Sequence, residues 1–114
     1  MMSMREAAAL DPWMLFREDE GLTLILAKAA ADKLDFKYDG IFRRITLRVL
    51  SSLEAVGLTA AVATTLSKAG ISANVVAAYH HDHVYVPAKE AQRALEALQA
   101  LADAGRRGPA VLSS

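Results

Sequence analysis

The chain has 114 residues, of which 54% are hydrophobic, so it can bury a core of its own and is not expected to be disordered as a whole. Thirteen basic and thirteen acidic side chains give a formal net charge of zero, which argues against a broad electrostatic attraction to nucleic acid or anionic membranes. The absence of cysteine excludes disulfides, thiolate zinc sites and cysteine nucleophiles.

The apolar runs are too short to cross a membrane, and Met1–Leu10 lacks the basic and then apolar pattern of a signal peptide. We therefore expect a cytoplasmic protein without a membrane partner. The balanced charge leaves little repulsion between copies, which is compatible with self-association.

The N-terminal segment, residues 1–16, is expected to be helical or loose. Pro12 interrupts any helix there, because proline disfavours a helical conformation in the residue before it. Trp13 and Phe16 are expected to anchor this segment to the core rather than to bind a cofactor.

Residues 17–42 are expected to contribute a single strand. Arg17–Gly21 is a charged stretch typical of a solvated turn, and the apolar run Leu22–Ala27 that follows it predicts one strand. The helix-forming residues up to Leu34 predict a short helical turn, and Lys37–Gly40 predicts a loop.

The segment Arg44–Leu50 alternates apolar and polar residues with a period of two, which predicts a half-buried strand. Its expected buried face carries Ile45, Leu47 and Val49, and its expected solvated face carries Arg44, Thr46 and Arg48.

The next segment, Ser51–Ala69, predicts a helix that begins with a capping-box pattern at Ser51 and Glu54 and ends at Gly70. Its apolar stripe, at helical spacing, comprises Leu58, Val62, Leu66 and Ala69.

The segment Ile71–Tyr79 is mostly apolar on both faces, which predicts a central strand. A tight turn at His80–Asp82 is expected to join it to a strand at His83–Val86. Lys89–Ala102 predicts an amphipathic helix, and residues 105–114 predict a flexible tail.

This order of elements over residues 43–104 predicts the α+β class, with a ferredoxin-like antiparallel sheet and both helices on one face. No final strand is evident after Ala102, so the sheet is expected to have an open edge that pairs with another strand. Either Leu22–Ala27 or a second chain would complete the sheet, and we therefore expect a dimer.

Four sequence strings carry a family resemblance, namely SSLEAVGLTA (51–60), GISANVVA (70–77), YHHDHVYVP (79–87) and, upstream, REDEGLTL (17–24). Together they resemble the ACT domain, a ferredoxin-like amino-acid-sensing module, and within it a branch of small bacterial ACT-like proteins without an assigned activity. The resemblance implies that residues 17–42 are a shortened ACT-like half and that residues 43–104 are an ACT-like domain.

The resemblance also implies a ligand site in the loop after the first strand and on the second strand, at an interface between subunits or half-domains. Its residues are Ser51, Ser52, Glu54, Val56, Gly57, Leu58, Asn74 and Val75. Backbone N–H groups at a helix start favour a carboxylate, Gly57 allows close approach, and the Asn74 amide can pair with both charged groups of an amino acid. The alternative is structural, with Ser51 and Glu54 only capping the helix and Asn74 forming local hydrogen bonds.

The cluster His80–His83 could ligate zinc, nickel or copper through His81, Asp82 and His83. A hairpin turn explains the same residues, and successive strand residues point to opposite faces of a sheet. The turn interpretation is therefore favoured, and no metal is predicted.

Arg43, Arg44 and Arg48 form a local basic patch, but the strand has no aromatic residue on which RNA bases could stack, so no nucleic-acid partner is expected. No cofactor motif, phosphate loop or catalytic constellation is found, so we expect neither a cofactor nor an enzyme.

The resulting hypothesis is a non-catalytic regulatory module that senses a small molecule, an amino acid according to the resemblance, as a homodimer. The alternative is an assembly module that pairs through its sheet edge and binds no small molecule. A metal-binding protein that uses His80–His83 is a weaker hypothesis.

Overall fold

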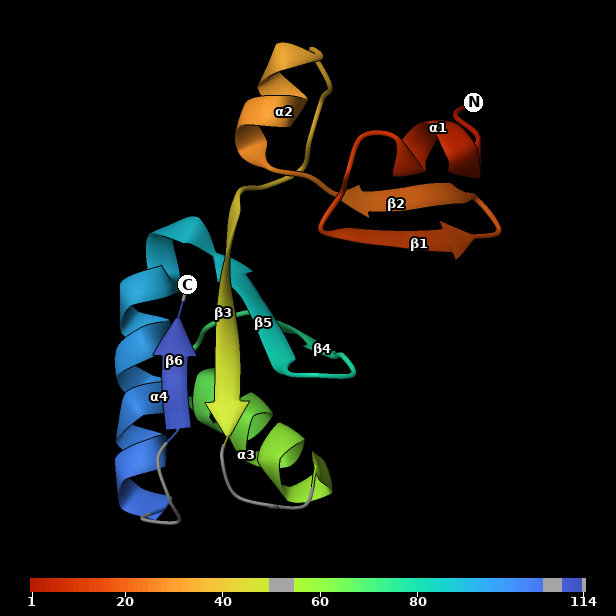
Figure 1. Ribbon diagram of the computed structural model, residues 1–114. Coiled ribbons are helices and arrows are strands. Elements are labelled where there is room, and N and C mark those ends of the chain that lie inside the picture. The colour runs from red at the N-terminus through yellow and green to blue at the C-terminus, as the bar shows by residue number, and fades with distance from the viewer. Residues whose placement is uncertain (50–54, 106–109, 114) are drawn as a thin grey trace. The chain divides into compact units, whose positions relative to one another are not determined.

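The computed structural model of the chain describes residues 1–49, 55–105 and 110–113. The chain divides into two compact units, Met1–Asp39 and Gly40–Ser114, each with its own sheet (Figure 1). No helix among the described residues combines the length and the apolar content that crossing a membrane requires.

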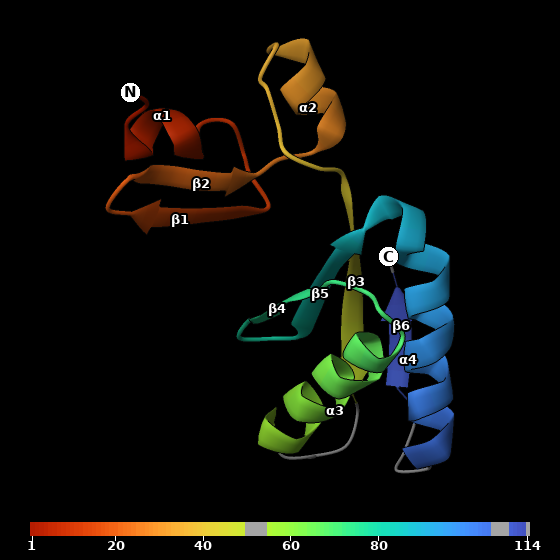
Figure 2. The same cartoon turned by 180° about the vertical axis from the view of Figure 1, so that it is seen from behind.

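The larger unit is built from four strands and two helices. They are β3 (Phe42–Val49), α3 (Ala55–Lys68), β4 (Asn74–Ala77), β5 (Asp82–Pro87), the 3-10 turn η1 (Ala88–Glu90), α4 (Ala91–Gly105) and β6 (Ala110–Ser113). The strands lie in the order β4-β5-β3-β6, and all neighbours are antiparallel. Both helices cover the same face of this sheet, as the view from behind in Figure 2 shows. The predicted α+β, ferredoxin-like fold is therefore confirmed.

The core of this unit lies between the sheet and the two helices. Because β3 and β5 pair Ile45 with Val84, both side chains point to the helix-covered face and are fully buried there. Its buried residues are Ile45, Leu47, Val62, Leu66, Ile71, Val84, Val86, Ala94 and Leu98. The apolar stripes predicted for the two helices are confirmed by this cluster, whereas the side chain of Val49 and the capping box at Ser51 and Glu54 lie outside the described part of the chain.

The end of α3 at Gly70 is fixed by backbone hydrogen bonds. Gly70 has a φ of 74°, its N–H donates to Ser67 O at 3.0 Å, and the Ile71 N–H donates to Leu66 O at 2.9 Å. These two bonds form a Schellman motif, in which the residue after the glycine also packs against the last turn of the helix. Arg93 of α4 donates from Nη2 to the carbonyl of Ala69 at 2.6 Å, so the second helix helps to satisfy the end of the first.

The smaller unit consists of α1 (Met4–Ala8), β1 (Met14–Glu18), β2 (Gly21–Ile25) and α2 (Lys28–Lys33). The strands form an antiparallel hairpin that pairs Met14 with Ile25 and Glu18 with Gly21. α1 begins with a capping box between Ser3 and Glu6, whose side chains each bond the other's backbone N–H.

Two predictions for this unit are wrong. The strand predicted at Leu22–Ala27 is present as β2, but residues 14–18, expected to be helical or loose and then in a charged turn, form β1 and pair with it. The turn is only Asp19 and Glu20, since an extended backbone is compatible with charged side chains when both faces are solvated. Trp13 and Phe16 do not anchor the segment in a core, because 60% and 57% of their surfaces are exposed.

The C-terminal tail was predicted to be flexible, but Ala110–Ser113 forms β6 and pairs with Thr46–Val49 of β3. The premise of a missing last strand is therefore wrong, and Leu22–Ala27 is not used to complete this sheet. A run of four residues has too little periodicity to reveal a strand, and its pairing partner lies more than sixty positions earlier in the chain.

The strand predicted at Ile71–Tyr79 is shorter than expected and lies at an edge. β4 spans Asn74–Ala77 and lies at the edge of the sheet. The central position predicted for the strand at Ile71–Tyr79 is occupied by β5 instead. The hairpin turn lies at Ala78–His81, closed by the Ala78 N–H donating to His81 O, and Asp82 already belongs to β5. Small alanine side chains make a strand look apolar on both faces in the sequence, but they do not require a neighbouring strand on each side.

Two glycine substitutions should have opposite effects on the free energy of unfolding. Gly70→Ala is expected to lower it by about 1 kcal/mol, because alanine disfavours a positive φ. Gly57→Ala is expected to raise it by up to about 1 kcal/mol, because Gly57 lies within α3 and an added Cβ would meet no atom within 4 Å. Urea unfolding of both variants measures this, and a loss of stability in Gly57→Ala would show that this helical turn is strained.

Candidate functional site

The predicted ligand residues near the start of α3 are only partly described. Ser51, Ser52 and Glu54 lie outside the described residues, and Val56 is part of the first turn of α3. Gly57 is exposed, whereas Leu58 packs against the core cluster. Of the two predicted residues here whose exposure the structure describes, Gly57 is the one that a ligand could approach, and Leu58 has a structural role.

The two predicted residues on β4 point to opposite faces of the sheet. Val75 pairs with Val84 and packs against the core under the helices. Asn74 pairs with Tyr85, so its side chain lies on the face that the helices leave uncovered, and it is exposed. Only Asn74 can therefore meet a ligand from solvent.

Within one copy of the unit, Gly57 and Asn74 do not form a common site. Gly57 lies in the first turn of α3, and the helix of 14 residues is about 20 Å long. Asn74 follows beyond the other end of that helix. It is the first residue of β4 and pairs with Tyr85, near the end of β5 at Pro87 and away from the end at which Asp82 pairs with Leu47. Figure 2 shows this arrangement, with the start of α3 and the start of β4 well separated.

The uncovered face of the sheet carries a polar group that the sequence did not reveal. Thr46 of β3 lies opposite His83 of β5, and Thr46 Oγ1 shares a hydrogen bond of 3.0 Å with His83 Nδ1. Thr46 was expected to be solvated, but only 5% of its surface is exposed, and the neighbouring Tyr85 is 8% exposed. The alternation along β3 predicts that Thr46 lies on this face. Its hydrogen-bond partner, His83, can be identified only from the register between β3 and β5.

The surroundings of His83 favour the neutral form of its imidazole by lowering its pKa. Partial burial lowers the pKa of His83, and the positive charge of Arg44 and the nearby His81 lower it further. The ring of His81 lies 6.4 Å from that of His83, measured between centroids.

The residues proposed as metal ligands do not converge. Asp82 pairs with Leu47, which points to the helices, so Asp82 lies on the opposite face from His83. Nδ1 of His83 is directed to Thr46 instead. Among the residues that the structure describes, no three histidine, cysteine, aspartate or glutamate side chains are arranged to hold a metal ion.

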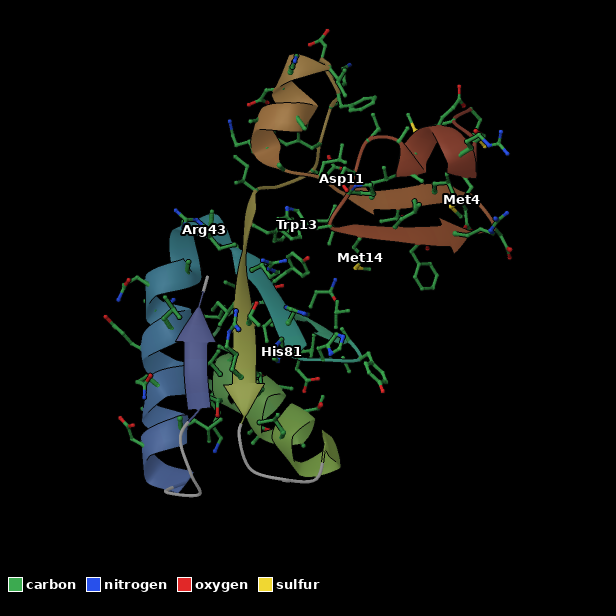
Figure 3. All side chains as sticks on the ribbon, in the orientation of Figure 1. Met4, Asp11, Trp13, Met14, Arg43 and His81 are labelled. Carbon is green, nitrogen blue, oxygen red and sulfur yellow. The ribbon has the colours of Figure 1, made fainter. Side chains whose placement is uncertain are left out.

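The three arginines of the predicted basic patch do not share one face. Arg44 and Arg48 lie on the uncovered face, whereas Arg43 alternates to the other side and is exposed. Figure 3 shows Arg43 near the start of β3, close to η1. It shows His81 just before the start of β5, at the other end of the β3–β5 pair.

Comparisons with known proteins give two family matches, both to models described as an ACT domain, at residues 43–100 and at residues 2–43. Among solved structures, the chain is similar to a Vibrio cholerae protein of unknown function, described as a possible transport protein, with 50% identity and a TM-score of 0.78 over 86% of this chain and 75% of that one. It is also similar to the ligand-free regulatory subunit of aspartate kinase from Thermus thermophilus, with 24% identity and a TM-score of 0.46 over 63% of this chain and 50% of that one. A comparison with curated proteins finds no match.

His83 should make the stability of the protein depend on pH. Its pKa in the folded state lies below that of an unfolded histidine, about 6.5, so the unfolded chain binds a proton that the folded chain does not. The free energy of unfolding should therefore fall as the pH drops below about 6.5 and should be insensitive to His83 above it. The measurement is urea unfolding between pH 5 and 8 for the wild type and for His83→Gln, whose neutral amide can still bond Thr46. Because all other titrating groups are common to both chains, the difference between the two curves isolates His83, and parallel curves would contradict the assignment.

Proposed function

Because this chain belongs to the ACT domain family, we propose that it is a non-catalytic regulatory module that binds an amino acid between two copies of the chain. ACT domains are in general regulatory modules that bind small molecules such as amino acids. In this proposal the ligand contacts the segment Ser51–Leu58 and Asn74 on β4.

The observation that carries the proposal is that Gly57 lies in the first turn of α3, whereas Asn74 lies on β4, beyond the other end of that helix. A ligand that touches both residues must bridge two copies of the chain, since an amino acid is much shorter than a helix of about 20 Å. The exposure of both residues, while Leu58 and Val75 pack in the core, supports their assignment as the ligand-contacting members of the set.

The chemistry of the two ends suits the two charged groups of an amino acid. The start of a helix in general offers N–H groups without acceptors inside the helix, and such groups favour a carboxylate. At Gly57, an added Cβ would meet no atom within 4 Å, so there is room for a ligand to approach the backbone. The Asn74 amide oxygen can accept from the ammonium group, and its NH₂ can donate to the carboxylate.

Regulation follows from differential affinity. A ligand that contacts two copies binds the associated state better than the separate chains and therefore favours association. By reciprocity, association raises the affinity for the ligand by the same factor. A partner protein that this module regulates would thus respond to the dimer.

A thermal-shift screen against the twenty amino acids tests the proposal. One amino acid or a small related group is expected to raise the melting temperature, because a ligand of the folded state stabilises it by mass action. Asn74→Ala should weaken that binding roughly ten- to hundredfold, the usual effect of losing a hydrogen bond to a charged group. Ser72→Ala, an exposed polar truncation outside β4, is the matched control and should leave the affinity unchanged.

Gly57→Asp provides the second arm, because it places a negative side chain where the carboxylate would lie. Ala63→Asp is its control, since Ala63 is also exposed on α3 but lies about 120° around the helix. Binding should be lost in Gly57→Asp alone, and sedimentation should show tighter dimerisation with ligand in the wild type. A dimer of equal affinity with and without any amino acid, and no thermal shift, would favour the assembly module instead.

A further inference from the structure

The uncovered face of the larger sheet has a polar centre with basic residues around it. The register of β3, β5 and β4 places Thr46 and His83 side by side, with Val76 on the far side of His83. Arg44 and Arg48 lie two residues before and after Thr46 on the same strand, and thus on the same face. Each arginine is a diagonal neighbour of His83, at roughly 7–8 Å between Cα atoms, which is within reach of a long side chain.

The charge on this face has one sign. Among the described residues of the four strands, the only carboxylate is that of Asp82, and it lies on the helix-covered face. Arg44 and Arg48 both lower the pKa of His83, and Asp82 on the other face raises it, so the imidazole lies within electrostatic reach of these three side chains. Arg48 is exposed, whereas Arg44 is half-buried.

The centre of the face can supply directed hydrogen bonds as well as charge. Thr46 is almost completely buried, so its hydroxyl is held in a fixed position by its bond to His83 Nδ1. Because Nδ1 is engaged, Nε2 is the ring nitrogen that remains for a ligand, and the structure shows it no hydrogen-bond partner among the described residues. A hydrogen-bonding centre between two guanidinium groups suits an oxyanion, which accepts several charge-assisted hydrogen bonds at once.

We propose that this face binds a small oxyanion, a carboxylate or a phosphate, above the Thr46–His83 pair, with Arg48 as the principal ligand and Arg44 adding positive charge. The site needs only one copy of the chain and uses neither the first turn of α3 nor Asn74. It shares no residue with the amino-acid site proposed above, so the failure of one proposal leaves the other standing.

Amide-resolved NMR of the ¹⁵N-labelled full chain tests the proposal by titration with inorganic phosphate and, separately, with succinate. Sodium chloride keeps the ionic strength constant, because a non-specific attraction between charges is screened by salt. The expected result is a saturable change in the amide signals of Thr46, Arg48 and His83 with one or both anions. Phosphate alone would identify a phosphate ester as the ligand class, and succinate alone would identify a carboxylate.

Arg48→Gln should weaken the binding at least tenfold, because it removes one charge-assisted pair from the site. Arg43→Gln is the matched control, since it removes the same charge from the same strand on the other face, at the position labelled in Figure 3. Thr46→Val, which keeps the shape of the side chain and removes its hydroxyl, should also weaken the binding. The amide spectrum of each free variant verifies its fold in the same experiment.

Two outcomes would overturn the proposal. Signals that do not saturate, or that sodium chloride reproduces at equal ionic strength, would mean that the face only attracts counterions. Equal losses in Arg48→Gln and Arg43→Gln would mean that net charge, rather than a site on this face, governs the binding.

Discussion

The pairing of β3 with β5 is the constraint on which the larger unit depends. It sets Ile45 against Val84 on the helix-covered face and Thr46 against His83 on the other. Because side chains alternate along a strand, a shift of this register by one residue would exchange the two faces, burying arginines under α3 and α4 and exposing the aliphatic core. The register therefore determines at once where the core lies and which polar residues share the uncovered face.

The alternation of β3 and the helical stripes of α3 and α4 could be predicted from the sequence because each is a local pattern with a strong apolar period. Ile45, Val62 and Leu66 were placed in the core for that reason, and they are buried. The end of α3 at Gly70 was equally local, since a positive φ at a helix end is a property of glycine itself.

The errors share a different cause, which is that they depend on pairing between distant segments. β6 is too short to be recognised before β3 offers it an edge, and the order of the strands, with β4 outside and β5 inside, is not encoded by the apolar pattern of either strand. The bond between Thr46 and His83 joins residues 37 positions apart and could be found only after the register was known. In the smaller unit, β1 was missed because its charged end, Arg17 and Glu18, resembles a turn until β2 pairs with it.

The candidate amino-acid site could be derived only in part, because the resemblance selects residues without saying whether they meet in one copy. Gly57 lies in the first turn of α3 and Asn74 beyond the other end of that helix, which is why the proposed site draws on a second copy of the chain.

The two proposed sites are joined by β3. Arg44, Thr46 and Arg48 lie along this strand, and the same strand leads, after Val49, into the segment before α3. An anion held above Thr46 and Arg48 would bind best to a β3 that is fully paired with β5 and β6, because those pairs hold the three side chains on one face. β3 is thus the element that contributes to the core and to the uncovered face and that precedes, in the chain, the segment before α3.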